Sequence, residues 1–135
     1  MRFVLDTNII FSGIYQLDSN AGRLLLLAAE GKIELLAPDH VKIELARILD
    51  LKLSFSKDEV DDIINSLPIN WIEEDIYVEK MEEASGLIAH DNDVPVLACA
   101  LALNAGIISG DKHFQRVRTK KIKVWKLKKA VAELE

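Results

Sequence analysis

Short apolar runs separated by longer helical stretches are the feature that most constrains this chain. Residues 2–5, 33–38 and 107–110 lack the regular polar alternation of a strand that has one face in water. Strands buried on both faces belong to parallel sheets, whose connections are usually helices. We therefore predict an α/β fold, a three-layer α/β/α sandwich around a central parallel sheet.

Helix and turn signals divide the rest of the chain. Ser56 and Glu59 have the spacing of a capping box, Gly31 and Gly106 are placed to stop two helices, and Pro95 falls in a first helical turn. The predicted strands are residues 2–5, 33–38, 70–74, 107–110 and 122–127. The predicted helices are residues 19–32, 39–50, 56–68, 75–88, 93–106 and 128–135, and residues 111–117 are expected to form a turn or a short helix.

Length and composition indicate one domain, residues 1–135, with the basic segment 116–129 included. Half of the residues are hydrophobic, which suffices for a core without disulfides. The single cysteine, Cys99, lies in an apolar helical run, so we expect a buried thiol and a cytoplasmic protein. We expect no signal peptide and no membrane association, because no apolar run reaches spanning length.

The net charge of −5 conceals an uneven distribution. Eight of the 17 Lys and Arg residues lie between Arg116 and Lys129, whereas 20 of the 22 acidic residues precede Arg116. An acidic body with a basic segment fits a metal site that meets a polyanion. A solvated surface strand and helix would give the same pattern.

Two aspartates follow predicted strands. Asp6 comes directly after the first strand, and Asp111 comes after the strand at 107–110. Ligand sites of parallel sheets lie beyond the carboxyl ends of the strands, so both residues are candidates for one site. Each by itself is also explained as a turn residue or a helix cap.

Two further acids lie on predicted helices. Glu44 falls on or beside the apolar stripe of its helix, where a carboxylate needs a partner; pairing with Lys42 or Arg47 in solvent is the alternative. Asp93 is placed to cap the helix that follows it, and such a carboxylate can also face a metal. Asp91 is either an auxiliary ligand or a solvated loop residue.

Four carboxylates in one crevice could not all stay ionised without a cation. Oxygen ligands favour Mg²⁺ or Mn²⁺, whereas zinc would usually recruit His or Cys. His40, His90 and His113 are scattered along the sequence and are expected on the surface or in loops, although His113 is close enough to Asp111 to touch a substrate phosphate. Such a metal site activates water and stabilises charge on a phosphodiester.

The ordered motifs resemble those of the PIN-domain nucleases. They are the first strand with "DTN", the acid in "VKIELARIL", the run "DVPVLACALA" and "ISGD", and the resemblance extends from Phe3 to about Trp125. It implies a central parallel sheet of four or five strands between helices. It also implies a metal-dependent endoribonuclease that uses Mg²⁺ or Mn²⁺ and forms a homodimer.

The resemblance assigns roles to particular residues. It makes Asp6, Glu44, Asp93 and Asp111 the catalytic and metal-binding acids, and Asn8 and Ser109 the polar residues that support the first acid. The size of the chain is similar to that of VapC-type toxins, which pair with an antitoxin protein.

Binding of RNA is expected along the basic segment, with phosphate contacts from Arg116, Arg118, Lys120 and Lys121. A domain that binds RNA or acts as a scaffold without cleaving is the main alternative function. A phosphatase with Asp6 as nucleophile is disfavoured, because that chemistry normally needs an aspartate where Asn8 stands.

Overall fold

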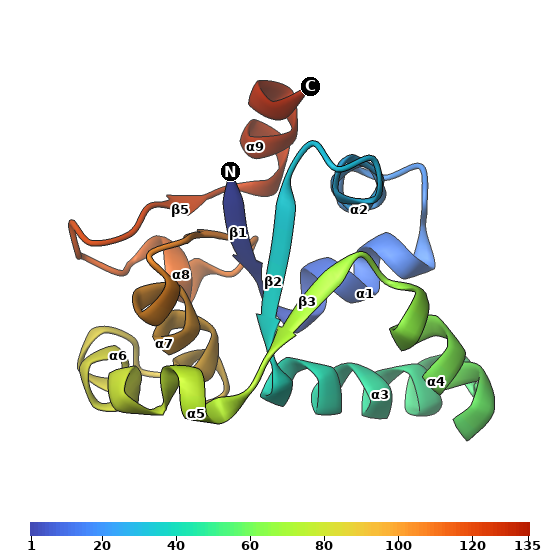
Figure 1. The fold of residues 1–135 in the computed structure, drawn as a ribbon, viewed down its shortest axis with the longest axis horizontal. Coiled ribbons are helices and arrows are strands. Elements are labelled where there is room, and N and C mark those ends of the chain that lie inside the picture. The colour runs from blue at the N-terminus through green and yellow to red at the C-terminus, as the bar shows by residue number, and fades with distance from the viewer.

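The computed structural model describes all residues, 1–135, and contains one five-stranded sheet in the order β3-β2-β1-β4-β5. Every neighbouring pair of strands is parallel, as Figure 1 allows the reader to follow. The strands are β1 (Arg2–Leu5), β2 (Glu34–Pro38), β3 (Ile69–Ile72), β4 (Gly106–Ile108) and β5 (Val124–Trp125). The predicted parallel α/β fold with four or five strands is therefore confirmed.

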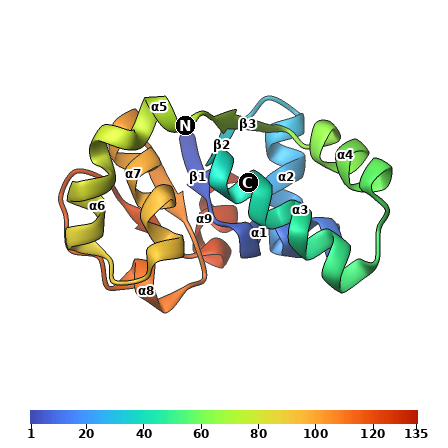
Figure 2. The same ribbon diagram turned by 90° about the horizontal axis from the view of Figure 1, so that it is seen from below.

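Helices cover both faces of the sheet. One face carries α5, α6 and α7, and the other carries α1, α2 and α3, as the view from below shows (Figure 2). The helices are α1 (Thr7–Tyr15), α2 (Asn20–Ala29), α3 (Asp39–Leu53), α4 (Lys57–Ser66), α5 (Glu74–Tyr77), α6 (Met81–Leu87), α7 (Val94–Leu103), α8 (Lys112–Gln115) and α9 (Leu127–Leu134). Two 3₁₀ turns, η1 (Val78–Lys80) and η2 (Asp91–Asp93), precede α6 and α7.

Burial explains why the strand sequences lack alternation. Val4 and Leu5 of β1 and Ile107 and Ile108 of β4 are fully buried, because helices lie against both faces of the central strands. Helix α7 is buried from Val94 to Ala100, which accounts for its almost uninterrupted apolar sequence. Cys99 lies in this helix and is a buried free thiol, as predicted.

Several local signals act as the sequence predicted. The Ser56 side chain accepts from the Glu59 backbone N–H at 3.2 Å, and Glu59 accepts in return from the Ser56 N–H at 3.1 Å, which completes the capping box of α4. Gly31 follows α2 with φ +77°, a conformation that glycine adopts without strain. The expected stop at Gly106 is wrong, because Asn104 ends α7 with φ 52° and Gly106 begins β4.

Helix α1 was absent from the sequence prediction. Its residues include Gly13, a poor helix former, yet a Cβ at this position would lie 2.7 Å from Leu25 Cδ1 and 3.1 Å from the Ala21 carbonyl oxygen. Glycine is therefore required for α1 to pack closely against α2, and this requirement outweighs helix propensity.

The segment predicted as one helix, residues 75–88, is helical from Glu74 to Leu87 but not as a single α-helix. The segment is divided into α5, η1 and α6. Tyr77 is buried, donates its hydroxyl to Asp39 Oδ1 at 2.6 Å, and has φ −115° and ψ −3°, away from helical values. The predicted strand at 122–127 is shortened to β5, because α9 begins at Leu127.

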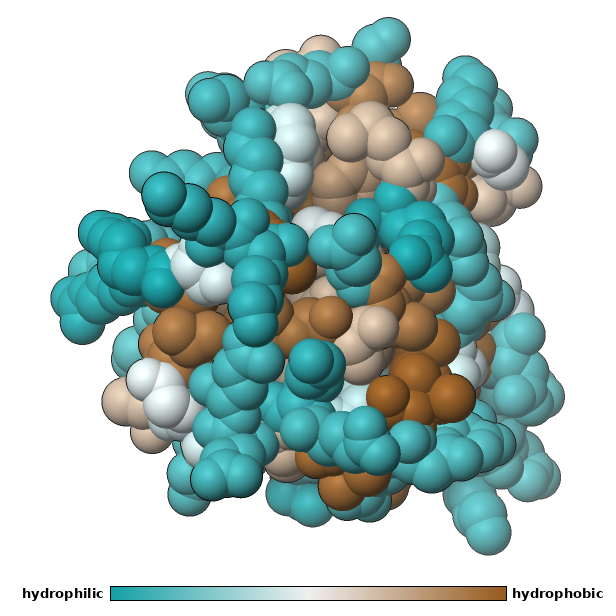
Figure 3. Space-filling view, turned by 60° about the vertical axis from the view of Figure 1, so that its left-hand side comes forward, coloured by the Kyte–Doolittle hydropathy of each residue, from teal (hydrophilic) through white to brown (hydrophobic).

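The side of the molecule at the left of Figure 1, formed by α5–α8 and the segment before β5, has a mostly hydrophilic surface with smaller hydrophobic patches (Figure 3). None of the helices is both long enough and apolar enough to cross a membrane.

Candidate metal centre

The sheet brings the sequence-predicted acids to one edge. Asp6 directly follows β1, and Asp111 lies three residues after Ile108, the end of β4; β1 and β4 pair in parallel with Leu5 opposite Ile108. Glu44 lies in α3, which begins at the end of β2, and Asp93 lies directly before α7. All four therefore extend from the carboxyl-terminal edge of the sheet or from helices beside it.

Asp6 is the most enclosed of the four acids, with 7% of its surface exposed. Its Oδ1 accepts from the Ile9 N–H at 3.1 Å and caps α1, while its Oδ2 accepts from the Ser109 hydroxyl at 2.5 Å. Burial raises the pKa of the Asp6 carboxyl, the two hydrogen bonds oppose this, and the charges of Asp111 and Asp93 raise it further. Asp6 therefore caps α1 and at the same time lies within the field of the other carboxylates.

Ser109 joins Asp6 to Asp111. Its Oγ, besides donating to Asp6, accepts from the Asp111 backbone N–H at 3.0 Å, and its carbonyl accepts from the Gln115 side chain at 3.1 Å. Ser109 is fully buried, so its hydroxyl has a fixed position. Asn8 is exposed and makes no side-chain hydrogen bond to Asp6; it lines the hollow beside the acid.

Glu44 is held by a residue that the sequence did not single out for this purpose. The Thr7 hydroxyl donates to Glu44 Oε1, and His40 Nε2 lies 3.9 Å from Glu44 Oε2. No salt bridge joins Glu44 to Lys42 or Arg47, the solvent partners that its sequence position allowed. Buried Thr7 follows Asp6 directly, so the contact ties α3 to the start of α1.

Asp93 lies at the start of α7 but its side chain makes no capping hydrogen bond. Burial raises the pKa of the Asp93 carboxyl, as do the charges of Asp111 and Glu44, while His113 and His90 lower it. His113 Nδ1 lies 3.5 Å from Asp93 Oδ2 and 2.9 Å from Asp111 Oδ1. The charge of Asp111 therefore acts on both Asp6 and Asp93, and that of Glu44 acts on Asp93.

Two of the histidines that lie apart in the sequence, His90 and His113, meet in the fold, and His90 is exposed in a loop as expected. The rings of His90 and His113 stack with centroids 3.6 Å apart and an interplanar angle of 28°. A loop and a short helix bring them together beside Asp93, and no spacing in the sequence indicates this contact. Asp91 is exposed and takes part in no side-chain hydrogen bond or salt bridge.

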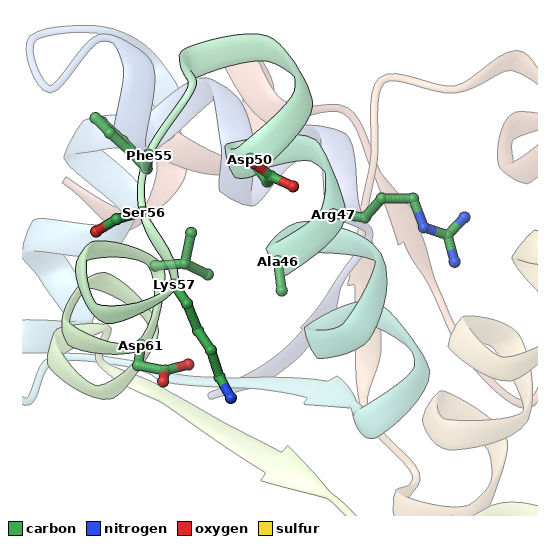
Figure 4. A pocket seen from close by; sticks show the side chains of 8 residues that line it. Ala46, Arg47, Asp50, Phe55, Ser56, Lys57 and Asp61 are labelled. Atoms are coloured by element: carbon green, nitrogen blue, oxygen red, sulfur yellow. The ribbon is translucent and has the colours of Figure 1, made fainter.

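Two hollows in the surface differ in the residues that line them. One of about 320 Å³ lies directly over the acids and is lined by Asp6, Asn8, Ile9, Ser12, Gly110 and Asp111. A larger hollow of about 430 Å³ lies between α3 and α4, where Arg47 points away from Asp50 and no salt bridge joins the lining residues (Figure 4). The larger hollow is lined by two basic and two acidic side chains, whereas both charged residues of the first, Asp6 and Asp111, are carboxylates, and the first is therefore the candidate site.

The residues at this edge fit a hard divalent cation. Carboxylate oxygens are the donors that Mg²⁺ and Mn²⁺ prefer, and burial first, then the neighbouring carboxylates, raise the pKa values of Asp6 and Asp93. His113 Nδ1 and His40 Nε2 are buried atoms beside these acids without hydrogen-bond partners. Fold and site together define a parallel α/β domain with a group of carboxylates at the carboxyl-terminal edge of its sheet.

The family follows from a direct comparison. The chain belongs to the PIN domain family, whose model matches residues 4–135, and the resemblance seen in the sequence motifs is confirmed. Members of this family are generally nucleases. No curated protein sequence matches the chain.

Two solved structures share the fold. The first is VapBC2 from Rickettsia felis bound to a DNA fragment from their promoter, with 25% identity, a TM-score of 0.65, and coverage of 93% of this chain and 98% of that chain. The second is VapBC-1 from nontypeable Haemophilus influenzae, with 19% identity, a TM-score of 0.63, and coverage of 95% and 99%. The similarity to small VapC-type PIN proteins thus extends over nearly the whole chain.

Proposed function

We propose that this protein is a metal-dependent endoribonuclease that hydrolyses RNA phosphodiester bonds with Mg²⁺ or Mn²⁺. Asp6, Glu44, Asp93 and Asp111 hold the metal. The observation that supports this proposal above all is the burial of Asp6 within the field of other carboxylates, an arrangement that costs stability unless a cation is bound.

The chain supplies an oriented set of ligands. When bound, the metal activates water and stabilises charge that develops on the phosphodiester. The Ile9 N–H and the Ser109 hydroxyl hold both oxygens of Asp6, and the Thr7 hydroxyl holds Glu44. Such hydrogen-bonded partners orient metal ligands and adjust their basicity. Asn8, exposed at the rim of the hollow, is available to RNA or to a metal-bound water.

RNA is attracted by the basic segment that begins beside the site. Arg116 and Lys120 are exposed and make no side-chain hydrogen bond or salt bridge, so their charges are available to phosphates. Arg118 donates to the Gln115 carbonyl at 3.1 Å, and Lys121 pairs with Glu83 at 2.7 Å. We therefore assign the larger part of the phosphate attraction to Arg116 and Lys120.

Cleavage of RNA by the purified protein tests the function. The wild type is expected to degrade RNA with Mn²⁺ and not with EDTA, and Asp6→Asn is expected to abolish cleavage. Asp62→Asn, at an exposed position of α4, is the control for loss of one carboxylate and should cleave normally. Equal cleavage by the wild type and Asp6→Asn would point to a contaminating nuclease and refute the assignment.

A toxin role with an antitoxin partner is a further part of the proposal. The related solved structures are of VapBC, and here Tyr15 and Leu51 leave 69% and 72% of their surfaces exposed near the ends of α1 and α3. Tyr15 stacks on Phe11 at 6.0 Å, and Lys52 lies 5.4 Å from the Phe11 ring, so the two helix ends are neighbours. This exposed apolar area supports contact with an antitoxin.

Two observations test the partner proposals. A short adjacent gene whose product binds the chain and blocks cleavage would support the antitoxin, and its absence would favour a stand-alone nuclease. A homodimer, expected from the family resemblance, is tested by light scattering of the purified protein. A monomer at all concentrations would contradict it.

The single buried cysteine supports the cytoplasmic location expected from the sequence.

A domain that binds RNA without cleaving it is the alternative. RNA binding measured with EDTA and with Mn²⁺, beside the cleavage assay, separates the two functions. Tight binding without cleavage under any divalent ion would favour the alternative.

A further inference from the structure

A second group of metal-ligand side chains adjoins the four acids. His90, Asp93 and His113 each offer one ligand atom, and these three atoms lie within 4.8 Å of one another. They come from the loop before η2, the start of α7 and helix α8, so the group exists only in the folded chain. Two of its members are imidazoles, which the carboxylate centre does not contain.

The surroundings of His113 leave a ring nitrogen without a hydrogen bond. His113 Nδ1 is buried, and although it lies 2.9 Å from Asp111 Oδ1, the pair does not have hydrogen-bond geometry; that oxygen already accepts the His113 backbone N–H at 2.8 Å. Nδ1 also lies 3.5 Å from Asp93 Oδ2. An unpartnered imidazole nitrogen facing two carboxylates is a position that a cation can occupy.

We propose that His90, Asp93 and His113 form a transition-metal site that binds Zn²⁺. Two imidazoles and one carboxylate are a donor set that zinc accepts and that Mg²⁺ does not select. Tetrahedral ligands about 2.0–2.1 Å from zinc are about 3.3 Å apart, and zinc lies in the plane of each imidazole that binds it. The His90 ring must therefore leave its stack on His113 and turn a nitrogen toward the ion. His90 is exposed and free to make this movement. The fourth position is left to water or to a phosphate oxygen.

The proposed zinc site shares Asp93 with the carboxylate centre, so zinc binding should affect the binding of Mg²⁺ or Mn²⁺. Zinc bound by His90 and His113 draws Asp93 away from the Mg²⁺ or Mn²⁺ ion, and it adds positive charge beside Asp111. Zinc is therefore expected to inhibit Mn²⁺-dependent cleavage, a consequence that rests on the proposed nuclease function. The binding of zinc itself does not depend on that function.

Zinc affinity measured with and without excess Mg²⁺ tests the site, because Mg²⁺ competes for Asp93 and the other carboxylates but not for the two imidazoles. Metal-free protein is titrated with Zn²⁺ against a chromophoric chelator. The wild type is expected to bind one equivalent. His90→Ala and His113→Ala should each weaken binding by more than the roughly 10–100-fold that loss of an outer-shell partner costs. His40→Ala is the matched control, because His40 adjoins Glu44 but lies outside the group, and it should bind as the wild type does.

Histidine NMR spectra of the unaltered protein give an independent readout. The chain has three histidines, so Zn²⁺ in excess Mg²⁺ should shift the imidazole signals of His90 and His113 and leave those of His40 in place. No zinc retained by the wild type, or equal retention by the His90 and His113 variants, would overturn the proposal. Asp6→Asn, which retains all three ligands, should still bind zinc while it loses cleavage. The two proposals therefore fail separately.

Discussion

Removal of the Ser109 hydroxyl tests the linkage that holds the acidic edge together. In Ser109→Ala, the Asp6 carboxylate loses a 2.5 Å hydrogen bond, and full burial of Ser109 leaves no room for water to replace it. Hydrogen bonds to charged groups contribute about 1.5–3 kcal/mol, so we expect this loss in the free energy of unfolding at neutral pH. For a chain of 135 residues this corresponds to a fall in Tm of about 5–11 °C.

The dependence of that loss on pH follows from the Asp6 pKa. Burial raises this pKa, the Ser109 hydrogen bond lowers it, and the variant therefore has a still higher folded-state pKa than the wild type. Where the pH lies above both folded-state pKa values, Asp6 is ionised and the wild type gains the full benefit of the hydrogen bond. As the pH falls through the folded pKa values, which lie above the ordinary 3.8, Asp6 becomes neutral in both proteins and the difference shrinks.

Urea unfolding of both proteins at several pH values measures the effect. Ser66→Ala is the control, because the exposed Ser66 hydroxyl donates only to the Ile63 carbonyl at 2.8 Å, and its loss should stay within about 0.5 kcal/mol. Unchanged stability of Ser109→Ala at neutral pH, or an equal loss at every pH, would refute the account of Ser109 as the partner of a buried carboxylate.

Three further predictions concern the same structure. Asp6→Asn should raise stability without metal at neutral pH, because it removes a carboxylate whose raised pKa makes stability fall as the pH rises from 3.8 to that pKa. Asn Oδ1 can still accept the Ile9 N–H, and its NH₂ can donate to Ser109 Oγ in place of the bond that the hydroxyl now donates. Urea titration should find no gain below pH 3.8 and the full gain above the raised pKa. Mn²⁺ at 100 times its Kd should stabilise the wild type by about 2.7 kcal/mol and leave Asp6→Asn unaffected in a thermal-shift assay. Gly22→Ala places a Cβ 2.0 Å from the Leu17 carbonyl oxygen and should lower the free energy of unfolding by more than about 3 kcal/mol. Gly86→Ala places a Cβ with nothing within 4 Å and should raise that free energy by up to about 1 kcal/mol. Denaturant unfolding measures both changes. Equal effects of the two glycine variants would contradict the packing argument.

Some features of the site are local enough to be predicted from the order of residues. Asp6 and Asp111 each follow a strand by a few residues, and parallel strands direct such positions to one edge. Glu44 lies on a helix that begins at the same edge, and its helical spacing indicated a contact other than solvent. The contact with Thr7 was not predictable, because it joins side chains from different elements and neither periodicity nor spacing records it.

The sequence by itself determined the parallel α/β architecture, since runs without polar alternation can be buried only between two helical layers. It also determined that four acids are available at the strand ends and helix starts around one edge of the sheet. Tertiary structure alone decided that α1 packs against α2 closely enough to require Gly13. It also decided that Asn8, predicted with Ser109 to support Asp6, is exposed, while the Ser109 hydroxyl donates to Asp6. It alone stacked His90 on His113, because the positions of side chains from separate loops depend on how the whole core packs.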